Sequence, residues 1–138
     1  MKKILVVMFL LAGLTLVVSA SGNFSESLKS CSSYSENGTV KTDGIVVKSA
    51  KQILGWEKDR CVYRETIDFA GINTTITCKL NKSQIGEITS VMDAYAILEN
   101  YSENNVDTSS VENVQNNPIV KVWNKYLNDK SVCSITTN

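Results

Sequence analysis

The positions of four cysteines constrain the fold of this 138-residue chain more than any other feature of its sequence. Cys31, Cys61, Cys78 and Cys133 are separated by 30, 17 and 55 positions. A thioredoxin-like redox site needs a CxxC motif, and zinc sites usually contain ligand pairs only two to four residues apart. Neither spacing occurs here. An even number of distant cysteines therefore predicts two disulfides, formed in an oxidising compartment.

The pairing of the four cysteines is open, because the sequence alone allows three connectivities. We predict Cys61–Cys78, since a turn centred on Gly71 would bring the segments on either side of it together. That bond would close a loop of about 18 residues, worth about 3 kcal/mol in the chain-entropy model. It leaves Cys31–Cys133 as the second bond. The pairing Cys31–Cys78 with Cys61–Cys133 fits almost as well.

The N-terminal segment has the composition of a secretory leader. Two lysines precede the apolar run Ile4–Val18, and small residues follow it. We predict a signal peptide over residues 1–20, which leaves residues 21–138 as a single small domain. The apolar run of about 15 residues is shorter than the roughly 20 that a membrane-spanning helix needs, so we expect no stable membrane span after cleavage. A retained N-terminal anchor is the alternative.

The charged residues exclude several classes of function. The chain has 14 basic and 14 acidic residues and no histidine; removal of two leader lysines leaves 12 against 14, a net charge of −2. Because no basic patch occurs, we expect no nucleic-acid partner. Without histidine, Ser–His and Cys–His nucleophilic sites are excluded. Gly-rich phosphate loops and nucleophile elbows are also absent. We therefore expect no enzymatic activity, no cofactor and no metal.

Residue alternation in the middle of the chain predicts β-structure. Arg60–Phe69 and Thr74–Leu80 both alternate apolar and polar residues, which predicts a hairpin. Gly44–Trp56 predicts a strand before it, with a bulge near Ser49-Ala50 where the alternation changes parity. A short first strand is expected within Ser30–Ser35. The turn after it would lie at Asn37-Gly38 or at Asp43-Gly44. These segments would form a three- to four-stranded antiparallel meander.

Helical signals begin after Leu80. Apolar residues recur at steps of three and four up to Tyr101, and Asn81 with Gln84 has the spacing of a capping box. Pro118, with Asn117 as cap, predicts a second helix. Between the helices, about 99–117, the sequence predicts a polar mobile loop, and Cys133 would lie in an extended tail. We expect a disulfide-braced α+β fold with both helices packed on one face of the meander.

The succession of motifs resembles a known group of proteins. A leader and an isolated early cysteine are followed by Ile53-Leu54-Gly55-Trp56, by Arg60-Cys61-Val62-Tyr63 and by Cys78-Lys79-Leu80 before a helix. This order resembles small uncharacterised cysteine-containing secreted proteins of Gram-negative bacteria. The resemblance covers about half of the chain. It implies a periplasmic or secreted location and carries no activity.

Four residues stand out as candidates for binding: Trp56, Tyr63, Glu65 and Trp123. Glu65 is the only charge on the otherwise inward face of its predicted strand. The structural alternative is that Glu65 reaches solvent or pairs with a lysine. The three aromatic residues could line an apolar pocket between the sheet and the helices, although large aromatics are more often part of a core.

Two functions from different classes fit this scaffold. The leading hypothesis is a non-enzymatic interaction module that binds another envelope or extracellular protein, through its open sheet face or the predicted loop at about 99–117. The alternative is a carrier of a small ligand, a lipid or a metabolite, with its pocket near Trp56, Tyr63 and Trp123.

Overall fold

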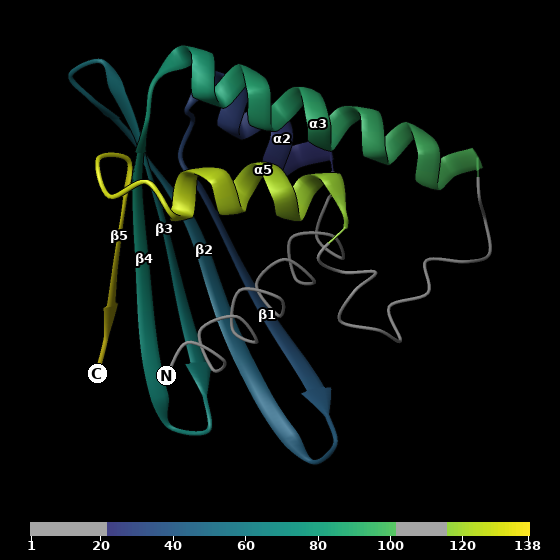
Figure 1. Cartoon of the computed structure of the whole chain (residues 1–138), viewed down its shortest axis with the longest axis vertical. Helices are drawn as coiled ribbons and strands as arrows, with labels where there is room; N and C mark the ends of the chain where they lie inside the picture. The colour runs from purple at the N-terminus through teal and green to yellow at the C-terminus, as the bar shows by residue number, and fades with distance from the viewer. Residues whose placement is uncertain (1–21, 102–115) are drawn as a thin grey trace.

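The computed structural model describes residues 22–101 and 116–138 of the chain (Figure 1). In chain order the elements are helix α2 (Gly22–Ser30), strands β1 (Tyr34–Thr42), β2 (Ile45–Glu57), β3 (Arg60–Phe69) and β4 (Ile72–Leu80), helices α3 (Lys82–Tyr101) and α5 (Pro118–Leu127), and strand β5 (Cys133–Thr137). The described residues thus form the expected α+β fold. The predicted leader at 1–20 and most of the predicted loop at 99–117 lie outside them.

The sheet is an antiparallel meander with strand order β1-β2-β3-β4-β5. The kind of sheet is as predicted, but it has five strands instead of three or four. The first strand begins at Tyr34, within the expected Ser30–Ser35, but it continues to Thr42. Its turn is at Asp43-Gly44, where both residues have positive φ. The tail around Cys133 is a fifth strand, because it pairs along β4.

Helix α2 was not predicted from the sequence. Only two of its residues, Phe24 and Leu28, form an apolar stripe, and the rest of the segment is polar. Both are buried, with 2 % and 0 % of their surface exposed. Residues four apart lie on one face of a helix, so this short pair is enough to seat α2 on the core once the sheet exists.

A β-bulge interrupts β2 close to its end. The register with β3 shifts between Ile53 and Gly55, and Gly55 has a φ of 108°. Leu54 is therefore the extra residue, and the bulge predicted near Ser49-Ala50 is wrong. Glycine adopts this backbone conformation without a steric cost, which explains the position of the bulge. As a consequence Trp56 lies opposite Cys61.

Both C-terminal helices begin as predicted. At α3 the Asn81 side chain accepts from the Gln84 amide and the Gln84 side chain accepts from the Asn81 amide, each at 2.8 Å. At α5 the Asn117 side chain accepts a hydrogen bond from the Ile119 amide at 2.9 Å. These caps satisfy amides that the first turn of a helix leaves without an intrahelical partner.

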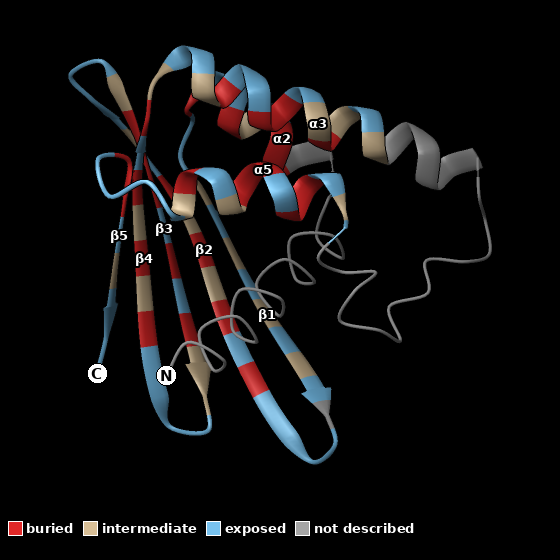
Figure 2. Cartoon of the chain, in the orientation of Figure 1, coloured by how far each residue is buried: buried red, intermediate tan, exposed pale blue. Residues whose placement is uncertain are grey.

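One hydrophobic core lies between the helices and one face of the sheet. Buried and less buried positions alternate along β4 and along most of β3, as Figure 2 shows. We call the face that carries the core residues the inner face. On β3 it presents Cys61, Tyr63 and Ile67, and the helices contribute residues such as Ile88 and Trp123. The helices are gathered over the end of the sheet where β4 passes into α3 (Figure 1).

The structure corrects the predicted disulfide pairing. The bonds are Cys31–Cys61 and Cys78–Cys133, so Cys61–Cys78 with Cys31–Cys133 is wrong. The reason is the register of the β3–β4 hairpin, which places Cys78 opposite Tyr63 and Cys61 opposite Leu80. The two cysteines are thus offset by two positions. Cys78 instead faces Cys133 directly across β4 and β5.

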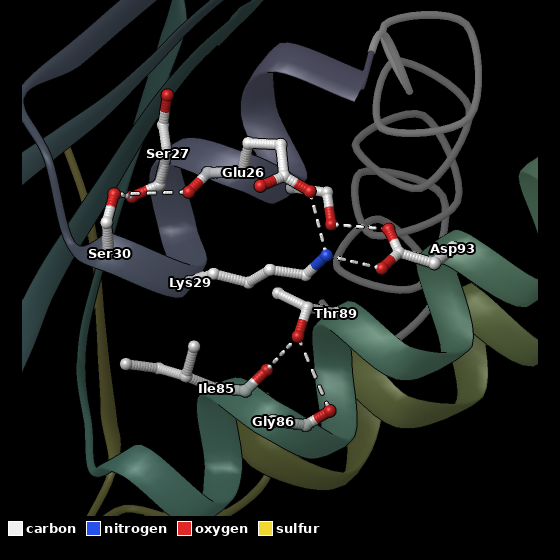
Figure 3. A network of polar contacts seen from close by, with 9 residues as sticks. Glu26, Ser27, Lys29, Ser30, Ile85, Gly86, Thr89 and Asp93 are labelled. Carbon is white, nitrogen blue, oxygen red and sulfur yellow. Dashed lines mark hydrogen bonds and ion pairs between the residues drawn. The ribbon is translucent and has the colours of Figure 1, made fainter.

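Helix α2 is held to α3 by a polar network as well as by the core (Figure 3). The Lys29 ammonium lies 2.6 Å from the Asp93 carboxylate, and the Ser25 hydroxyl donates to the same group at 2.7 Å. Lys29 and Asp93 remain 41 % and 43 % exposed, so water screens the ion pair and its contribution is small. The network therefore orients α2, whereas burial and the Cys31–Cys61 bond hold it in place.

Candidate functional site

Two of the four candidate residues lie together in the core. The rings of Tyr63 and Trp123 have centroids 5.1 Å apart at a tilt of 39°. Phe24 adds an edge contact with Tyr63 at 5.9 Å. Both Tyr63 and Trp123 are almost completely buried, at 1 % and 3 % exposure. Their rings therefore fill space between β3 and α5 that the sequence analysis considered as a pocket.

Trp56 lies apart from that pair, at the end of β2. It is 43 % exposed and borders an open hollow of about 690 Å³. The other lining residues are Lys58, Asp59, Asn81, Lys82 and Ser83, from the β2–β3 turn and the start of α3. We call Trp56 and these five residues the Trp56 surface. Because neither Tyr63 nor Trp123 lines the hollow, the three aromatic candidates do not form one site.

The electrostatic character of the Trp56 surface is positive on balance. Two lysines, Lys58 and Lys82, line it with a single carboxylate, Asp59. The first turn of α3 adds the partial positive charge of a helix N-terminus. Outside the hollow, Lys79 lies 2.9 Å from Glu57, and this contact lowers the pKa of the Glu57 carboxyl. The Trp56 surface thus presents an apolar indole ring next to mainly positive charge.

Glu65 belongs to a row of three charges across the inner face. Glu36 on β1 lies directly opposite Lys51 on β2, and Lys51 lies directly opposite Glu65 on β3. We call these three residues the polar row. Tyr34 donates to Glu36 at 2.8 Å and Tyr63 donates to Glu65 at 2.9 Å, so each carboxylate accepts from the tyrosine two positions earlier in its own strand.

The inward direction of Glu65 was predicted, and its burial is nearly complete. Glu65 and Lys51 are 2 % and 3 % exposed. Burial raises the pKa of Glu65, against the opposing charge of Lys51 and the hydrogen bond from Tyr63. Burial also lowers the pKa of Lys51, while the charges of Glu65 and Glu36 act against that shift. The inner face therefore disfavours the charged form of both groups.

The sequence analysis missed Glu36, Lys51 and Tyr34. A signal for Lys51 was present, because it shares its parity with Val47 and Ile53, which are both buried. The bulge that we expected near Ser49 interrupts that pattern, so Lys51 was not recognised as an inward-facing residue. Glu36 was missed because the first strand was expected to end by Ser35, with a turn at Asn37-Gly38 as one alternative, and Tyr34 was not singled out because its hydrogen bond is to Glu36.

We predict that the Glu65→Gln variant gains stability relative to the wild type as the pH rises. In the folded chain the pKa of Glu65 lies above its ordinary value of 4.5. The wild type is thus free of the ionisation penalty below that value, and it incurs the penalty as the pH rises through the folded pKa. Glutamine does not ionise. Urea unfolding of both proteins between about pH 4 and pH 8 measures the difference; a constant or opposite trend would contradict the prediction.

Comparison with known proteins gives no family for this chain. It matches no protein-family model, no curated protein and no solved structure. In residues 22–101 and 116–138, no helix combines the length and apolar character needed to span a membrane. All four cysteines are paired, which is consistent with an exported protein. The resemblance to secreted proteins of Gram-negative bacteria stays a prediction, and function has to be argued from the sites themselves.

Proposed function

We propose that the chain is an exported interaction module that binds another envelope or extracellular protein through the Trp56 surface. The observation that carries this proposal is the position of Trp56 itself. Its ring is 43 % exposed beside an open hollow, and a glycine-dependent bulge directs it there. Bulges commonly re-aim a side chain in this way.

The contrast between the two tryptophans supports the proposal. Trp123 is packed into the core and has an evident structural role, whereas the core does not enclose Trp56. Tryptophan is one of the residues that are enriched among those that dominate binding energy at protein interfaces. An exposed tryptophan beside a concave surface thus has the features of an interface anchor.

The charges of the Trp56 surface indicate the chemistry of the partner. Lys58, Lys82 and the start of α3 favour a partner that presents carboxylates around an apolar side chain. Rim charges of this kind mainly accelerate association and make it sensitive to salt. We therefore expect capture of the partner to weaken as the ionic strength rises.

Export is supported by the two disulfides together with the N-terminal leader composition. A carrier with a pocket near Trp56, Tyr63 and Trp123 stays the alternative prediction. The packing of Tyr63 against Trp123 in the core, and the separate position of Trp56, favour the interaction module.

The test is crosslinked affinity capture from an envelope extract, followed by a binding measurement with the purified partner. Trp56→Ala is expected to weaken binding by at least about tenfold, in line with the loss of an interface anchor. Ile72→Ala is the matched control, because Ile72 is 39 % exposed at the opposite end of the sheet. Equal binding by wild type and Trp56→Ala, or equal losses in both variants, would overturn the proposal.

A further inference from the structure

We propose that the polar row on the inner face binds the ammonium group of a small alkylamine ligand, through the carboxylate of Glu65. This site is independent of the Trp56 surface, since it lies within the inner face of β1, β2 and β3. Three features of the polar row support this site: an unsatisfied acceptor, an uncompensated charge and the aliphatic residues beside them.

The unsatisfied acceptor is Glu65 Oε1. Within the described residues this atom is buried and has no hydrogen-bond partner, while Oε2 accepts from Tyr63 at 2.9 Å. A buried polar atom without a partner costs free energy, and a charged one costs more. Such atoms are uncommon in folded proteins, and each needs an explanation, of which a bound donor is one. Glu65 Oε1 can therefore accept a hydrogen bond from one further donor.

The charge balance of the row indicates that the missing donor is cationic. Two carboxyl groups, Glu36 and Glu65, flank one amino group, Lys51, so the row carries one negative charge in excess when all three groups are ionised. Buried charges are stable when they are paired. An ammonium on Glu65 would complete an alternating row of four charges and supply a charge-assisted hydrogen bond.

The neighbouring residues fit a short alkyl chain. On the inner face Glu65 lies opposite Ile76, and Ile67 is the next inward residue of β3. Both isoleucines are 2 % exposed. A primary alkylamine matches this combination of one carboxylate and adjoining aliphatic side chains.

The competing explanation is that Glu65 is simply protonated, or that a buried water donates to it. Protonation would remove the buried negative charge, and a water would supply the donor, in both cases without any ligand. Both explanations predict that an added amine leaves the inner face unchanged. The proposal predicts saturable binding that depends on the charge of Glu65.

The experiment is an amide-detected NMR titration of the purified exported protein with n-butylammonium, with n-butanol as the uncharged probe of equal length. We expect saturable shifts in β2 and β3 around Lys51 and Glu65 with the amine. Affinity should fall at least about tenfold in Glu65→Gln, because the substitution removes the charge and keeps the side-chain shape. Glu87→Gln is the control for loss of one surface carboxylate, since Glu87 bonds to Lys125 on α5.

Each outcome of this titration either supports the proposed amine site or overturns it. Binding by wild type and Glu87→Gln, with weak binding by Glu65→Gln and weak binding of n-butanol, supports the site. Equal binding of amine and alcohol, equal binding by all three proteins, or no saturation at high millimolar amine overturns it. An amide spectrum of Glu65→Gln with native dispersion shows that a loss of binding does not reflect unfolding. Because the Trp56 surface is untouched, these results leave the proposed partner binding to its own test.

Discussion

Replacement of all four cysteines by alanine is expected to leave the chain unfolded at room temperature. The two bonds close loops with sequence separations of 30 and 55. In the chain-entropy model each loop is worth about 4 kcal/mol, so together they contribute about 8 kcal/mol. Domains of this size are stable by only about 5–15 kcal/mol in total. Loss of both bonds therefore removes most or all of the stability, as equilibrium urea unfolding would show.

The two losses should be nearly additive, because the loops follow one another along the chain and share no residues. Cys31–Cys61 holds the end of α2 to β3, and Cys78–Cys133 holds β5 to β4. Each pair replaced by alanine alone should cost about 4 kcal/mol and leave a folded protein. If replacing either cysteine pair by alanine lowers the free energy of unfolding by less than about 1 kcal/mol, the prediction is wrong.

A tryptic map without reductant identifies the pairing, because each cysteine falls in a different peptide. We expect Ser30–Lys41 linked to Cys61–Arg64, and Glu65–Lys79 linked to Ser131–Asn138. A link between Cys61–Arg64 and either of the last two peptides would contradict the structure.

The elements that the sequence predicted are those with a local signal. Alternation over Arg60–Phe69 predicted β3, and the side-chain caps at Asn81 and Asn117 predicted the starts of α3 and α5. In each case the residues that determine the element lie within it or next to it. Helix α2 and strand β5 lack such signals. Two buried apolar residues seat α2, and β5 contains one buried residue, Cys133.

The disulfide pairing and the grouping of the candidate site residues depend on the register between strands, which the sequence does not determine. A single extra residue, Leu54, decides that Trp56 faces the same side as Cys61. The inward position of Glu65 was predictable from parity within β3 alone. Its neighbours Lys51 and Glu36 come from two other strands, so finding the polar row required the alignment of all three.

Replacement of Trp123 by alanine is expected to cost about 3–5 kcal/mol, the usual cost of deleting a buried large aromatic. The side chain is 3 % exposed and stacks on Tyr63. It also stands in the middle of the buried stripe of α5, with Ile119, Val122 and Tyr126. The cavity would lie between α5 and β3, so the contact between the helix and the sheet should weaken as well.

Two variants make this result specific to the core. Trp56→Ala removes the same side chain from a site with 43 % exposure and should cost no more than about 1 kcal/mol. Trp123→Phe keeps a ring against Tyr63 and removes the indole N–H, which is buried without a partner among the described residues. Its cost should therefore be well below that of alanine. Urea unfolding, followed by the fluorescence of the remaining tryptophan in each alanine variant and by circular dichroism in all, measures the three costs. Equal losses for Trp56→Ala and Trp123→Ala would mean that Trp123 does not anchor α5 to the sheet.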